Sequence, residues 1–377
     1  SIFRIWHIIA KFEYQLTFEC FYQILRIILM IFNVTLNRKH YFTILLNSIM
    51  KILVTGGLGF IGSNFIINIL KKFPKYEITN LDDELYGSNH LNLKNLKKSK
   101  NYKFVKGNIC NEKLVKKLVK KCDLVVNFAA ESHVDRSISH PKPFIDSNIT
   151  GVFNILEQIK NERKKLIQIS TDEVFGSLKK DSANENYKLN PSSPYSSSKA
   201  AAELLVNSYV TTFDCECIIT RCTNNFGPRQ FPEKLIPKTI LLAYQNKKIP
   251  IYGSGKNIRD WIFVNEHCDA INKIITKGKN SQTYNISSGN ELDNITIVKK
   301  ILKIMEKSSE NIEFVNDRPG HDFRYSLDSL KMRKELNWSP KLNFDKNLEE
   351  TIEWYIENMK GLQNISKKAL TKLGWKN

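Results

Sequence analysis

The chain has 377 residues, of which 42% are hydrophobic and 25% are charged. This length and composition suggest two domains, or one large α/β domain with an appended lobe, and they exclude a small fold that depends on disulfides or metals. The seven cysteines match neither a zinc pattern nor a secreted disulfide framework, so we expect reduced thiols, a cytoplasmic protein and no metal site. The formal net charge is +19, but the lysines are dispersed, and we expect no nucleic-acid binding.

Residues 1–49 do not fit the pattern of the rest of the chain. The first convincing translation start is Met50, directly before the strand-like sequence KILVTGG. The segment 18–36 is apolar and about long enough to cross a bilayer, but Glu19 and Arg26 interrupt it at a cost. Three interpretations stay open: a membrane anchor, a targeting segment, or upstream sequence translated from a misplaced start. We favour the third, and expect membrane contact only if this extension is expressed and inserted.

From residue 51 onward, apolar strand-like runs alternate with helical patterns. The expected strands are 51–56, 77–83, 102–108, 122–130, 165–171 and 215–222, and the expected helices are 63–73, 113–121, 148–161 and 197–213. Such alternation predicts an α/β fold with a doubly wound parallel sheet. After about residue 225 the pattern becomes irregular. We therefore expect a first domain at 50–225, a smaller substrate-binding lobe at 226–360 that interleaves with it, and a tail at 361–377.

The stretch TGGLGFIGSN (55–64) places Gly56, Gly59 and Gly62 between a predicted strand and a predicted helix. Glycines at such a turn let a pyrophosphate approach the N-terminus of the helix closely. Asp82 stands twenty residues beyond Gly62, at the end of the second strand. A carboxylate there accepts from both ribose hydroxyls and repels a 2′-phosphate. We therefore predict that the first domain is of the Rossmann type and binds NAD rather than NADP.

The stretch YSSSKAAAELL places Tyr195 and Lys199 four residues apart, on one face of a helix. An ammonium close to a phenol lowers the pKa of the phenol, which gives tyrosine a role as a base near neutral pH. Together with the glycine turn, this spacing resembles the extended short-chain dehydrogenase/reductase family. The resemblance implies that Tyr195 is the general base, that Lys199 is its helper, and that Thr171 is the third member of the set.

The stretch ISTDEVFG (169–176) ends an apolar strand with Thr171, Asp172 and Glu173, although unpaired carboxylates are costly to bury. This motif resembles the signature of the dTDP-glucose 4,6-dehydratases. Four further stretches resemble the same family: AAESHVDRSI (129–138), NNFGPRQFPEKLIP (224–237), GSGKNIRDWIFVNEHCDAI (253–271) and DRPGHDFRYSLD (317–328). Together they extend the resemblance to residues 50–356.

The resemblance implies a hydro-lyase reaction that produces dTDP-4-dehydro-6-deoxy-glucose for deoxysugar (rhamnose-type) nucleotide biosynthesis. In this reaction NAD takes a hydride from sugar C4 while Tyr195 takes the O4 proton. Glu173 then removes the C5 proton and Asp172 protonates the departing C6 hydroxyl. The hydride finally returns to C6, and a proton returns to C5. One carboxyl must be protonated while the other is ionised, and adjacent like charges push their pKa values apart in this way.

The resemblance also assigns binding positions and a homodimer that pairs through the helices near 148–161 and 197–213. The cofactor positions are Gly56, Gly59, Phe60, Ile61, Gly62, Asp82, Leu85, Asn108, Ile109, Ala129, Ala130, Ser147, Tyr195, Lys199 and Asn225. The substrate positions are Ser132, Thr171, Asn224, Lys234, Leu235, Pro250, Ile251, Tyr252, Arg259, Asn294, Arg318 and His321. Asn108 departs from the family, which usually has Asp there to bind the adenine amine; Asn retains a carbonyl acceptor.

Two kinds of alternative stay open. The first is another sugar-nucleotide enzyme of the same fold: a UDP-glucose 4,6-dehydratase, a 4-epimerase or a decarboxylase. Epimerisation and decarboxylation need no acid at C6, so Asp172 favours a dehydratase, but the methyl group that separates thymine from uracil is worth only about 1–3 kcal/mol. The second is a nucleotide sensor or scaffold, which would not need the complete set of Thr171, Asp172, Glu173, Tyr195 and Lys199.

Overall fold

The computed structural model describes residues 49–341 and 343–362. The apolar segment 18–36, on which the membrane interpretation depends, lies outside these residues. Within them, no helix combines the length and the apolar character that crossing a bilayer requires.

The described residues form a seven-stranded parallel sheet with the strand order β10-β6-β5-β4-β1-β2-β3. Its strands are β1 (Lys51–Thr55), β2 (Glu77–Asp82), β3 (Tyr102–Lys106), β4 (Leu124–Asn127), β5 (Lys165–Thr171), β6 (Cys217–Cys222) and β10 (Thr283–Ile286). This confirms the predicted doubly wound fold. The order reverses between β1 and β4, and ligands of such sheets bind outside the carboxyl ends of the strands at this point.

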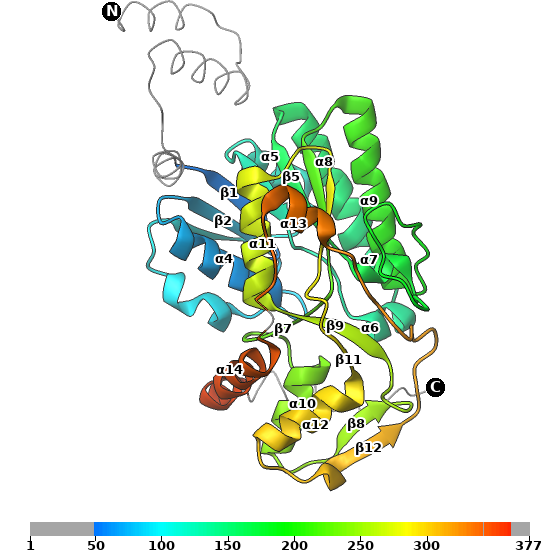
Figure 1. Cartoon of the computed structure of the whole chain (residues 1–377). Coiled ribbons are helices and arrows are strands. Elements are labelled where there is room, and N and C mark those ends of the chain that lie inside the picture. Colours follow the sequence, from blue (N-terminus) through cyan, green and yellow to red (C-terminus); the bar gives the residue numbers. More distant parts are fainter. Residues whose placement is uncertain (1–48, 342, 363–377) are drawn as a thin grey trace, which may run out of the picture. The chain divides into compact units, whose positions relative to one another are not determined.

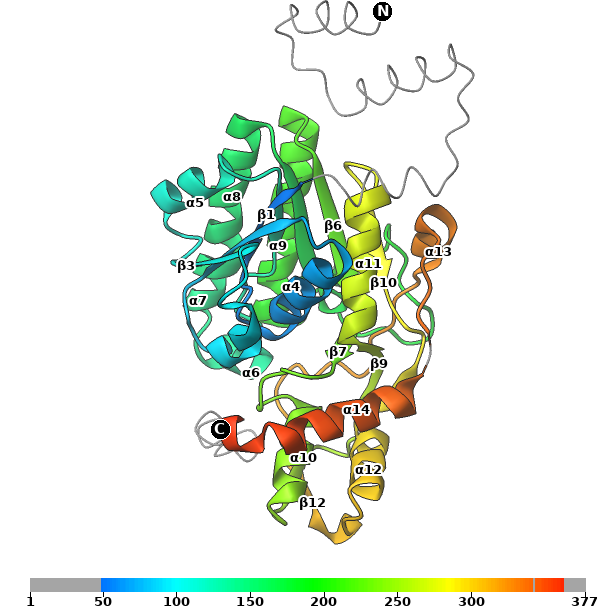
Figure 2. The same ribbon diagram turned by 90° about the vertical axis from the view of Figure 1, so that its left-hand side faces the viewer.

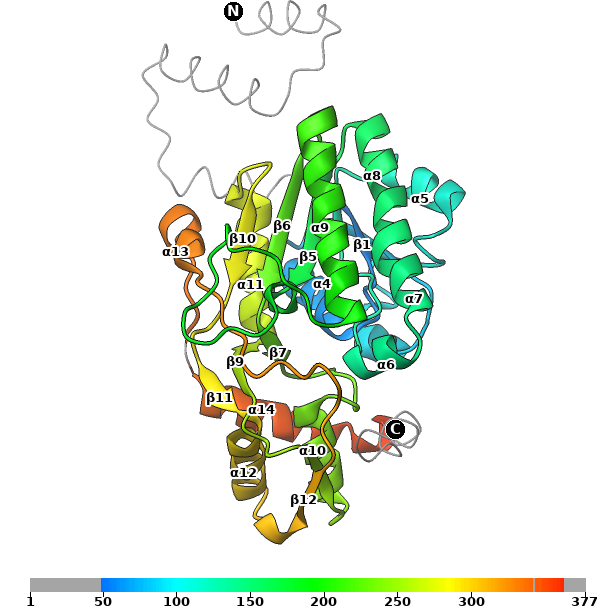
Figure 3. The same cartoon turned by 90° about the vertical axis from the view of Figure 1, so that its right-hand side faces the viewer.

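Helices cover both faces of the sheet (Figures 1 and 3). On one face lie α4 (Phe60–Lys72) and α11 (Val264–Lys277), which contact each other. The other face is covered by α5 (Glu112–Val119), α8 (Gly151–Glu162) and α9 (Pro194–Phe213). The helix predicted at 63–73 begins earlier, so that Phe60 and Ile61 belong to the first turn of α4 and not to the glycine turn.

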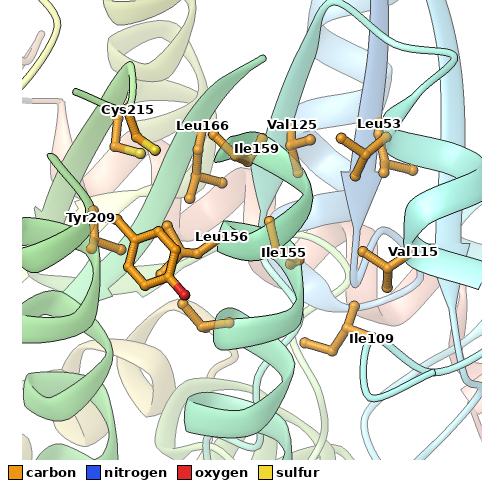
Figure 4. Packing of buried hydrophobic residues seen from close by; sticks show 14 of the residues in the cluster. Leu53, Ile109, Val115, Val125, Ile155, Leu156, Ile159, Leu166, Tyr209 and Cys215 are labelled. Atoms are coloured by element: carbon orange, nitrogen blue, oxygen red, sulfur yellow. The ribbon is translucent and has the colours of Figure 1, made fainter. Parts of the chain in front are cut away.

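An apolar core fixes the second of these helical layers against the sheet (Figure 4). Leu53, Val125 and Leu166 extend from β1, β4 and β5, and they pack in one cluster with Ile155 and Ile159 of α8. Because the strands are covered on both faces, they read as continuous apolar runs, as is typical of parallel sheets. The rigid sheet therefore holds the loops at its carboxyl edge in fixed positions.

Short helical segments lie in several of the connections. They are α6 (Val134–Ser139), α7 (Lys142–Ile145), a π-helical turn (Asp146–Thr150) and 3₁₀ turns at His90–Leu96, Asp172–Phe175 and Ser309–Asn311. The turn at Asp172–Phe175 follows β5 directly, and it therefore places both acids of the STDEVFG motif at the carboxyl edge of the sheet.

The C-terminal part forms a smaller lobe (Figures 1 and 2). It has a sheet of β7 (Asn224–Phe226), β9 (Ile258–Phe263) and β11 (Glu291–Asp293), a pair of β8 (Ile249–Tyr252) and β12 (Ile312–Val315), and helices α10 (Leu235–Tyr244), α12 (Asn294–Ile304) and α14 (Phe344–Glu357). The chain returns to the large sheet with α11 and β10, and α13 (Leu330–Leu336) contacts β10. The exact domain boundary at residue 225 stays a prediction.

Candidate active site

A cavity of about 320 Å³ lies at the carboxyl ends of the parallel strands. Residues that follow β1, β2, β3, β4, β5 and β6 all contribute to its lining. All five predicted catalytic residues and all fifteen predicted cofactor positions line it, among them Gly56, Asp82, Asn108, Asp172 and Tyr195. The structure thus brings together residues from 56 to 225, while their individual roles stay predictions.

The glycine turn has the shape that a dinucleotide needs. Gly56 has a φ of +70°, and a Cβ there would lie 2.6 Å from the backbone nitrogen of Ala129. A Cβ on Gly62 would lie 2.5 Å from the carbonyl oxygen of Gly56. No side chain caps the N-terminus of α4, so its first amides are available to a pyrophosphate. The residues present therefore fit the predicted NAD site.

Asp82 is buried at the end of β2, where it also supports the glycine turn. Its Oδ2 accepts from the backbone nitrogen of Leu58 at 2.9 Å, and its Oδ1 accepts from Ser88 Oγ at 2.7 Å. Oδ1 also accepts from the backbone nitrogen of Glu84 at 2.9 Å, and the three bonds fix the orientation of the carboxylate at the cavity wall. Because a carboxylate has about four acceptor sites, the remaining capacity for a ribose hydroxyl lies on Oδ2.

Asn108, the residue that departs from the family, is held by two hydrogen bonds. Its Oδ1 accepts from the backbone nitrogen of Cys110 at 2.7 Å, and its Nδ2 donates to Asp83 Oδ2 at 2.8 Å. Asp83 also lines the cavity. The side-chain oxygen of Asn108, which the sequence predicts to accept from adenine, already accepts from the backbone of Cys110. The carboxylate of Asp83 stands beside it as another acceptor.

The Tyr195–Lys199 pair lies at the start of α9. Ser193 caps this helix in a capping box with Ser196, and Pro194 occupies its first turn, so α9 begins three residues before the predicted start at 197. Both side chains are buried, and Lys199 Nζ donates to the carbonyl oxygen of Ile169 at 2.6 Å. Burial lowers the pKa of Lys199 to about 8.

The lowered pKa that sequence reasoning expected for Tyr195 is not found. Burial, followed by the charge of Glu173, raises the pKa of this phenol well above its ordinary value, and a hydrogen bond with Thr171 only partly opposes them. The physical reason is that Lys199 directs its ammonium to a backbone carbonyl, while the two acids lie close to the phenol.

The two adjacent acids have unequal surroundings. Burial first, and then the charge of Glu173, raise the pKa of Asp172 well above its ordinary value. Burial also raises the pKa of Glu173, but the cations Arg318, Lys234 and Arg259 oppose that rise. The predicted inequality of the pair therefore has a structural cause: the pKa of Asp172 is raised by burial and by Glu173, whereas the rise at Glu173 is opposed by the cations around it.

Asp172 also carries an unsatisfied polar atom. Thr171 Oγ1 donates to Asp172 Oδ1 at 3.1 Å, but Asp172 Oδ2 is buried and has no hydrogen-bond partner among the described residues. Buried polar atoms without partners are rare and often mark sites where a ligand binds. The free oxygen fits a substrate hydroxyl inside the cavity.

The predicted substrate positions fall into two groups. Ser132, Thr171, Asn224 and Lys234 line the cavity. Eight others do not: Leu235, Pro250, Ile251, Tyr252, Arg259, Asn294, Arg318 and His321. Of these, Ile251 packs in an apolar cluster of the C-terminal lobe, so its side chain is not free to contact a nucleotide. Arg259 and Arg318, by contrast, are close enough to Glu173 to influence its pKa.

Sequence reasoning missed several polar residues at the cavity. Tyr86 Oη donates to Glu233 Oε2 at 2.5 Å, His133 Nε2 lies 3.4 Å from the same oxygen, and the Arg136 guanidinium lies 4.1 Å from the centre of the Tyr86 ring. All four line the cavity. The sequence could have indicated three of them, because His133, Arg136 and Glu233 lie inside stretches that resemble the family. Tyr86 lies outside those stretches.

Comparisons with known proteins agree with this geometry. Residues 53–351 match the family model described as GDP-mannose 4,6 dehydratase. The low-salt glycan biosynthesis protein Agl12 of Haloferax volcanii is 44% identical over 308 residues, which are 81% of this chain and 99% of that protein. The dTDP-glucose 4,6-dehydratase of Mycobacterium tuberculosis is 40% identical over 313 residues, which are 82% of this chain and 94% of that protein.

A solved structure shows the same fold. The dTDP-glucose 4,6-dehydratase of Bacillus anthracis, in complex with NAD, superposes with a TM-score of 0.79 at 43% identity and covers 84% of this chain and 99% of its own. Family model, relatives and fold all point the same way: the chain belongs to the GDP-mannose 4,6-dehydratase family and, within it, to the dTDP-glucose 4,6-dehydratases.

Proposed function

We propose that this protein converts dTDP-glucose to dTDP-4-dehydro-6-deoxy-glucose as an NAD-dependent hydro-lyase. The observation that carries the proposal is the placement of Asp172 and Glu173 in the cavity that also holds Tyr195 and Lys199. A plain dehydrogenase needs the second pair only. A protein that removes water from the sugar needs an acid and a base in addition. Relatives that share most of the chain bear the same activity in their names.

The reaction begins at the sugar O4. Tyr195, four residues before Lys199 on α9, takes the O4 proton. Because burial and Glu173 raise the pKa of the phenol, Tyr195 must first lose its own proton to act as this base, and Lys199 Nζ is held nearby by the carbonyl oxygen of Ile169. When bound in the glycine turn, NAD accepts the hydride from C4 and later returns it to C6. The 4-ketone that results acidifies the proton on C5, which prepares the sugar for elimination.

Elimination uses the two carboxyls in different protonation states. Glu173, whose ionised form is favoured by the cations around it, acts as the base that removes the C5 proton. Asp172, whose pKa is raised by burial and by Glu173, is protonated and donates to the C6 hydroxyl, which leaves as water. As the hydride adds to C6, Glu173 returns its proton to C5 and is ionised again. Asp172 has then lost one proton and Tyr195 has gained the O4 proton, so one proton must pass from Tyr195 to Asp172, directly or through solvent, before the next turnover.

The substrate test compares two sugar nucleotides. The protein is incubated with dTDP-glucose and with UDP-glucose, and a 4-keto-6-deoxy sugar is detected by its alkali-induced absorbance. We expect product from dTDP-glucose, and the Asp172→Asn variant serves as the control. If only UDP-glucose gave product, the substrate would carry uracil and not thymine. If neither sugar nucleotide gave product, the dehydratase function would be contradicted.

We also propose that the protein acts in the cytoplasm as a homodimer. Phe153 of α8 and Leu204 and Phe213 of α9 are exposed apolar side chains on the two helices that the resemblance assigns to the dimer. Six unpaired cysteines among the described residues support a reducing compartment. The mass in solution, measured by light scattering for the wild type and for Leu204→Glu, tests the dimer: a monomeric wild type would contradict it.

A further inference from the structure

Asp135 connects two parts of the molecule beside the cavity. It lies in α6, which follows β4, and it is 4% exposed. Its Oδ1 accepts from Arg318 Nη1 at 2.9 Å, and its Oδ2 accepts from Tyr252 Oη at 2.9 Å. One carboxylate therefore holds a side chain of β8 and a side chain of the segment after β12, both of which belong to the C-terminal lobe (Figure 1).

Arg318 still has donors to offer. The ion pair with Asp135 engages Nη1, while Nε is buried and has no hydrogen-bond partner among the described residues. Burial by itself lowers the pKa of Arg318, but Asp135 outweighs it, and the pKa is raised above its ordinary value. A buried guanidinium with unused N–H groups is suited to bind an anion such as a diphosphate.

The charge of Arg318 also acts on the predicted base. Arg318 is the first of the cations that oppose the burial-raised pKa of Glu173. Arg259, another of these cations, donates to the backbone carbonyls of Ile258, Asp322 and Phe323, and Lys234 donates to the carbonyl of Ser132. Arg318 differs from them in that its guanidinium donates to the carboxylate of Asp135, so the loss of that charge frees Arg318 in particular to approach Glu173, and in a buried site opposite charges attract strongly.

Resting on the proposed function, we propose that Asp135 is a positioning residue: its carboxylate holds Arg318 where the guanidinium binds the diphosphate of the nucleotide, and it keeps Arg318 from forming an ion pair with Glu173. Asp135 itself does not touch the reacting atoms. Removing its charge should therefore weaken nucleotide binding and also make Glu173 a weaker base, because a closer Arg318 favours the ionised carboxylate.

The other titratable groups around Asp135 do not take over this role. His133, on the same turn, has its pKa lowered to about 3 by burial, and it is neutral near pH 7. Glu233 is a neighbouring acid whose own pKa is raised, first by burial. Tyr252, the second donor to Asp135, has a raised pKa and stays a neutral phenol. Within the described residues, Arg318 is thus the cation that pairs with Asp135.

The first measurement is the Kd for dTDP, with the full-length protein in its NAD-bound form. We expect Asp135→Asn and Arg318→Gln each to weaken dTDP binding by about tenfold, as for the loss of a hydrogen bond to a charged group. In the Arg318→Gln background, Asp135→Asn should add little. The matched control is Glu291→Gln: Glu291 also accepts from an arginine, Arg324, and from a hydroxyl, Ser326, but Arg324 is not among the cations that oppose the raised pKa of Glu173.

The second measurement is the pH profile of elimination in a single turnover. In Asp135→Asn the acidic limb that reports Glu173 should move to lower pH, and the plateau rate should fall. Glu291→Gln should leave the limb in place. These readouts separate positioning from mere stability, since a variant that is only less stable binds dTDP normally at temperatures where it is folded.

Several results would overturn the proposal. Normal dTDP affinity and an unshifted acidic limb in folded Asp135→Asn would make Asp135 a structural link only, as would additive losses in the double variant. If Asp135→Asn does not fold, Asp135→Glu carries the test, because it keeps the charge but moves it by one methylene: weaker dTDP binding supports positioning, and unchanged binding contradicts it. Turnover of dTDP-glucose by the wild type is measured first, so a failure of the proposed function is recognised separately.

Discussion

The two sides of the site differ in how the chain forms them. The side at the parallel sheet consists of loops that each follow one strand, and it holds Gly56, Asp82, Asp172, Glu173 and Tyr195. The C-terminal side of the proposed site combines β8, β9 and the segment after β12, which carry the predicted substrate residues Tyr252, Arg259, Arg318 and His321; none of these four lines the cavity itself. On the first side, position follows from the sheet itself, because carboxyl ends of parallel strands share one edge. On the second side, position depends on ion pairs and hydrogen bonds between distant segments, such as Arg318 with Asp135.

This difference suggests a division of labour. The parallel-sheet side carries the groups predicted to touch the reacting atoms, and a rigid sheet holds them accurately. The C-terminal side carries cations and an aromatic ring suited to a nucleotide diphosphate and its base. Substitutions on the first side should therefore reduce the rate of the chemical steps, whereas substitutions on the second should mainly change binding.

The largest effect is expected from Tyr195→Phe. The phenol is the predicted base for oxidation at C4, and every later step needs the ketone. We expect turnover to fall about ten-thousandfold, the upper end for a general base, with no transient absorbance of reduced cofactor in stopped flow. Lys238→Met is the control for a change outside the cavity lining. A normal absorbance transient in Tyr195→Phe would remove this residue from the oxidation step.

The next largest effects are expected from Asp172→Asn and Glu173→Gln. Both amides keep the size of the side chain but cannot exchange the proton that elimination requires. Turnover should fall about a hundred- to a thousandfold, while the reduced-cofactor transient remains and decays slowly. Equal loss of oxidation and elimination would indicate that the acids only shape the cavity, and full activity of both variants would sink the assignment.

The pH dependence of elimination should have two limbs with opposite signs. The pKa of Glu173 is raised by burial, so the rate should fall as the pH decreases through a value above that of an ordinary glutamate. The pKa of Asp172 is raised further, so the rate should fall again as the pH increases through its value, by about tenfold per pH unit. In Asp172→Asn the alkaline limb should disappear, and its persistence would assign that limb to another group such as Lys199.

The same two sides explain what sequence could predict. On the parallel-sheet side, short motifs contain both the fold signal and the chemistry: the glycine turn, Asp82 and the STDEVFG acids were all placed at one cavity in advance. Strand β10 (TYNI) was not among the expected strands, because it lies beyond residue 225, where the alternating pattern becomes irregular. Side-chain pairings such as Asp135 with Arg318 could not be derived, because 183 residues separate the partners and no periodic pattern relates them.

The predicted lowering of the Tyr195 pKa was wrong for a related reason. Spacing places Lys199 on the correct helix face, but the direction of its ammonium depends on the carbonyl of Ile169, which belongs to another element. Electrostatics in a buried site depends on all neighbours at once, and Glu173 outweighs what the motif alone suggests. Motifs thus predict which residues meet, and the packed structure decides what each one does to the others.

The smallest predicted effect tests the cofactor end of the parallel-sheet side. In this chain Asn108 donates to Asp83, so Asn108→Asp, although it restores the usual family residue, would set two carboxylates against each other. We expect NAD to bind about tenfold more weakly, the cost of one hydrogen bond to a charged group turned into repulsion. The measurements are the fraction of NAD retained after gel filtration and the Kd for NAD of the stripped protein.

Two further variants make this prediction specific. Asn111→Asp adds the same charge three residues away, where a carboxylate still caps α5 by accepting from Leu114, and it should retain NAD normally. Asp83→Asn combined with Asn108→Asp restores one donor and one carboxylate with their places exchanged, and it should recover most of the affinity. If the single variant binds NAD as well as the wild type, or if the exchange does not restore binding, the pair does not act as a unit. The parallel-sheet side would then tolerate changes at its cofactor end as freely as the family resemblance alone suggests.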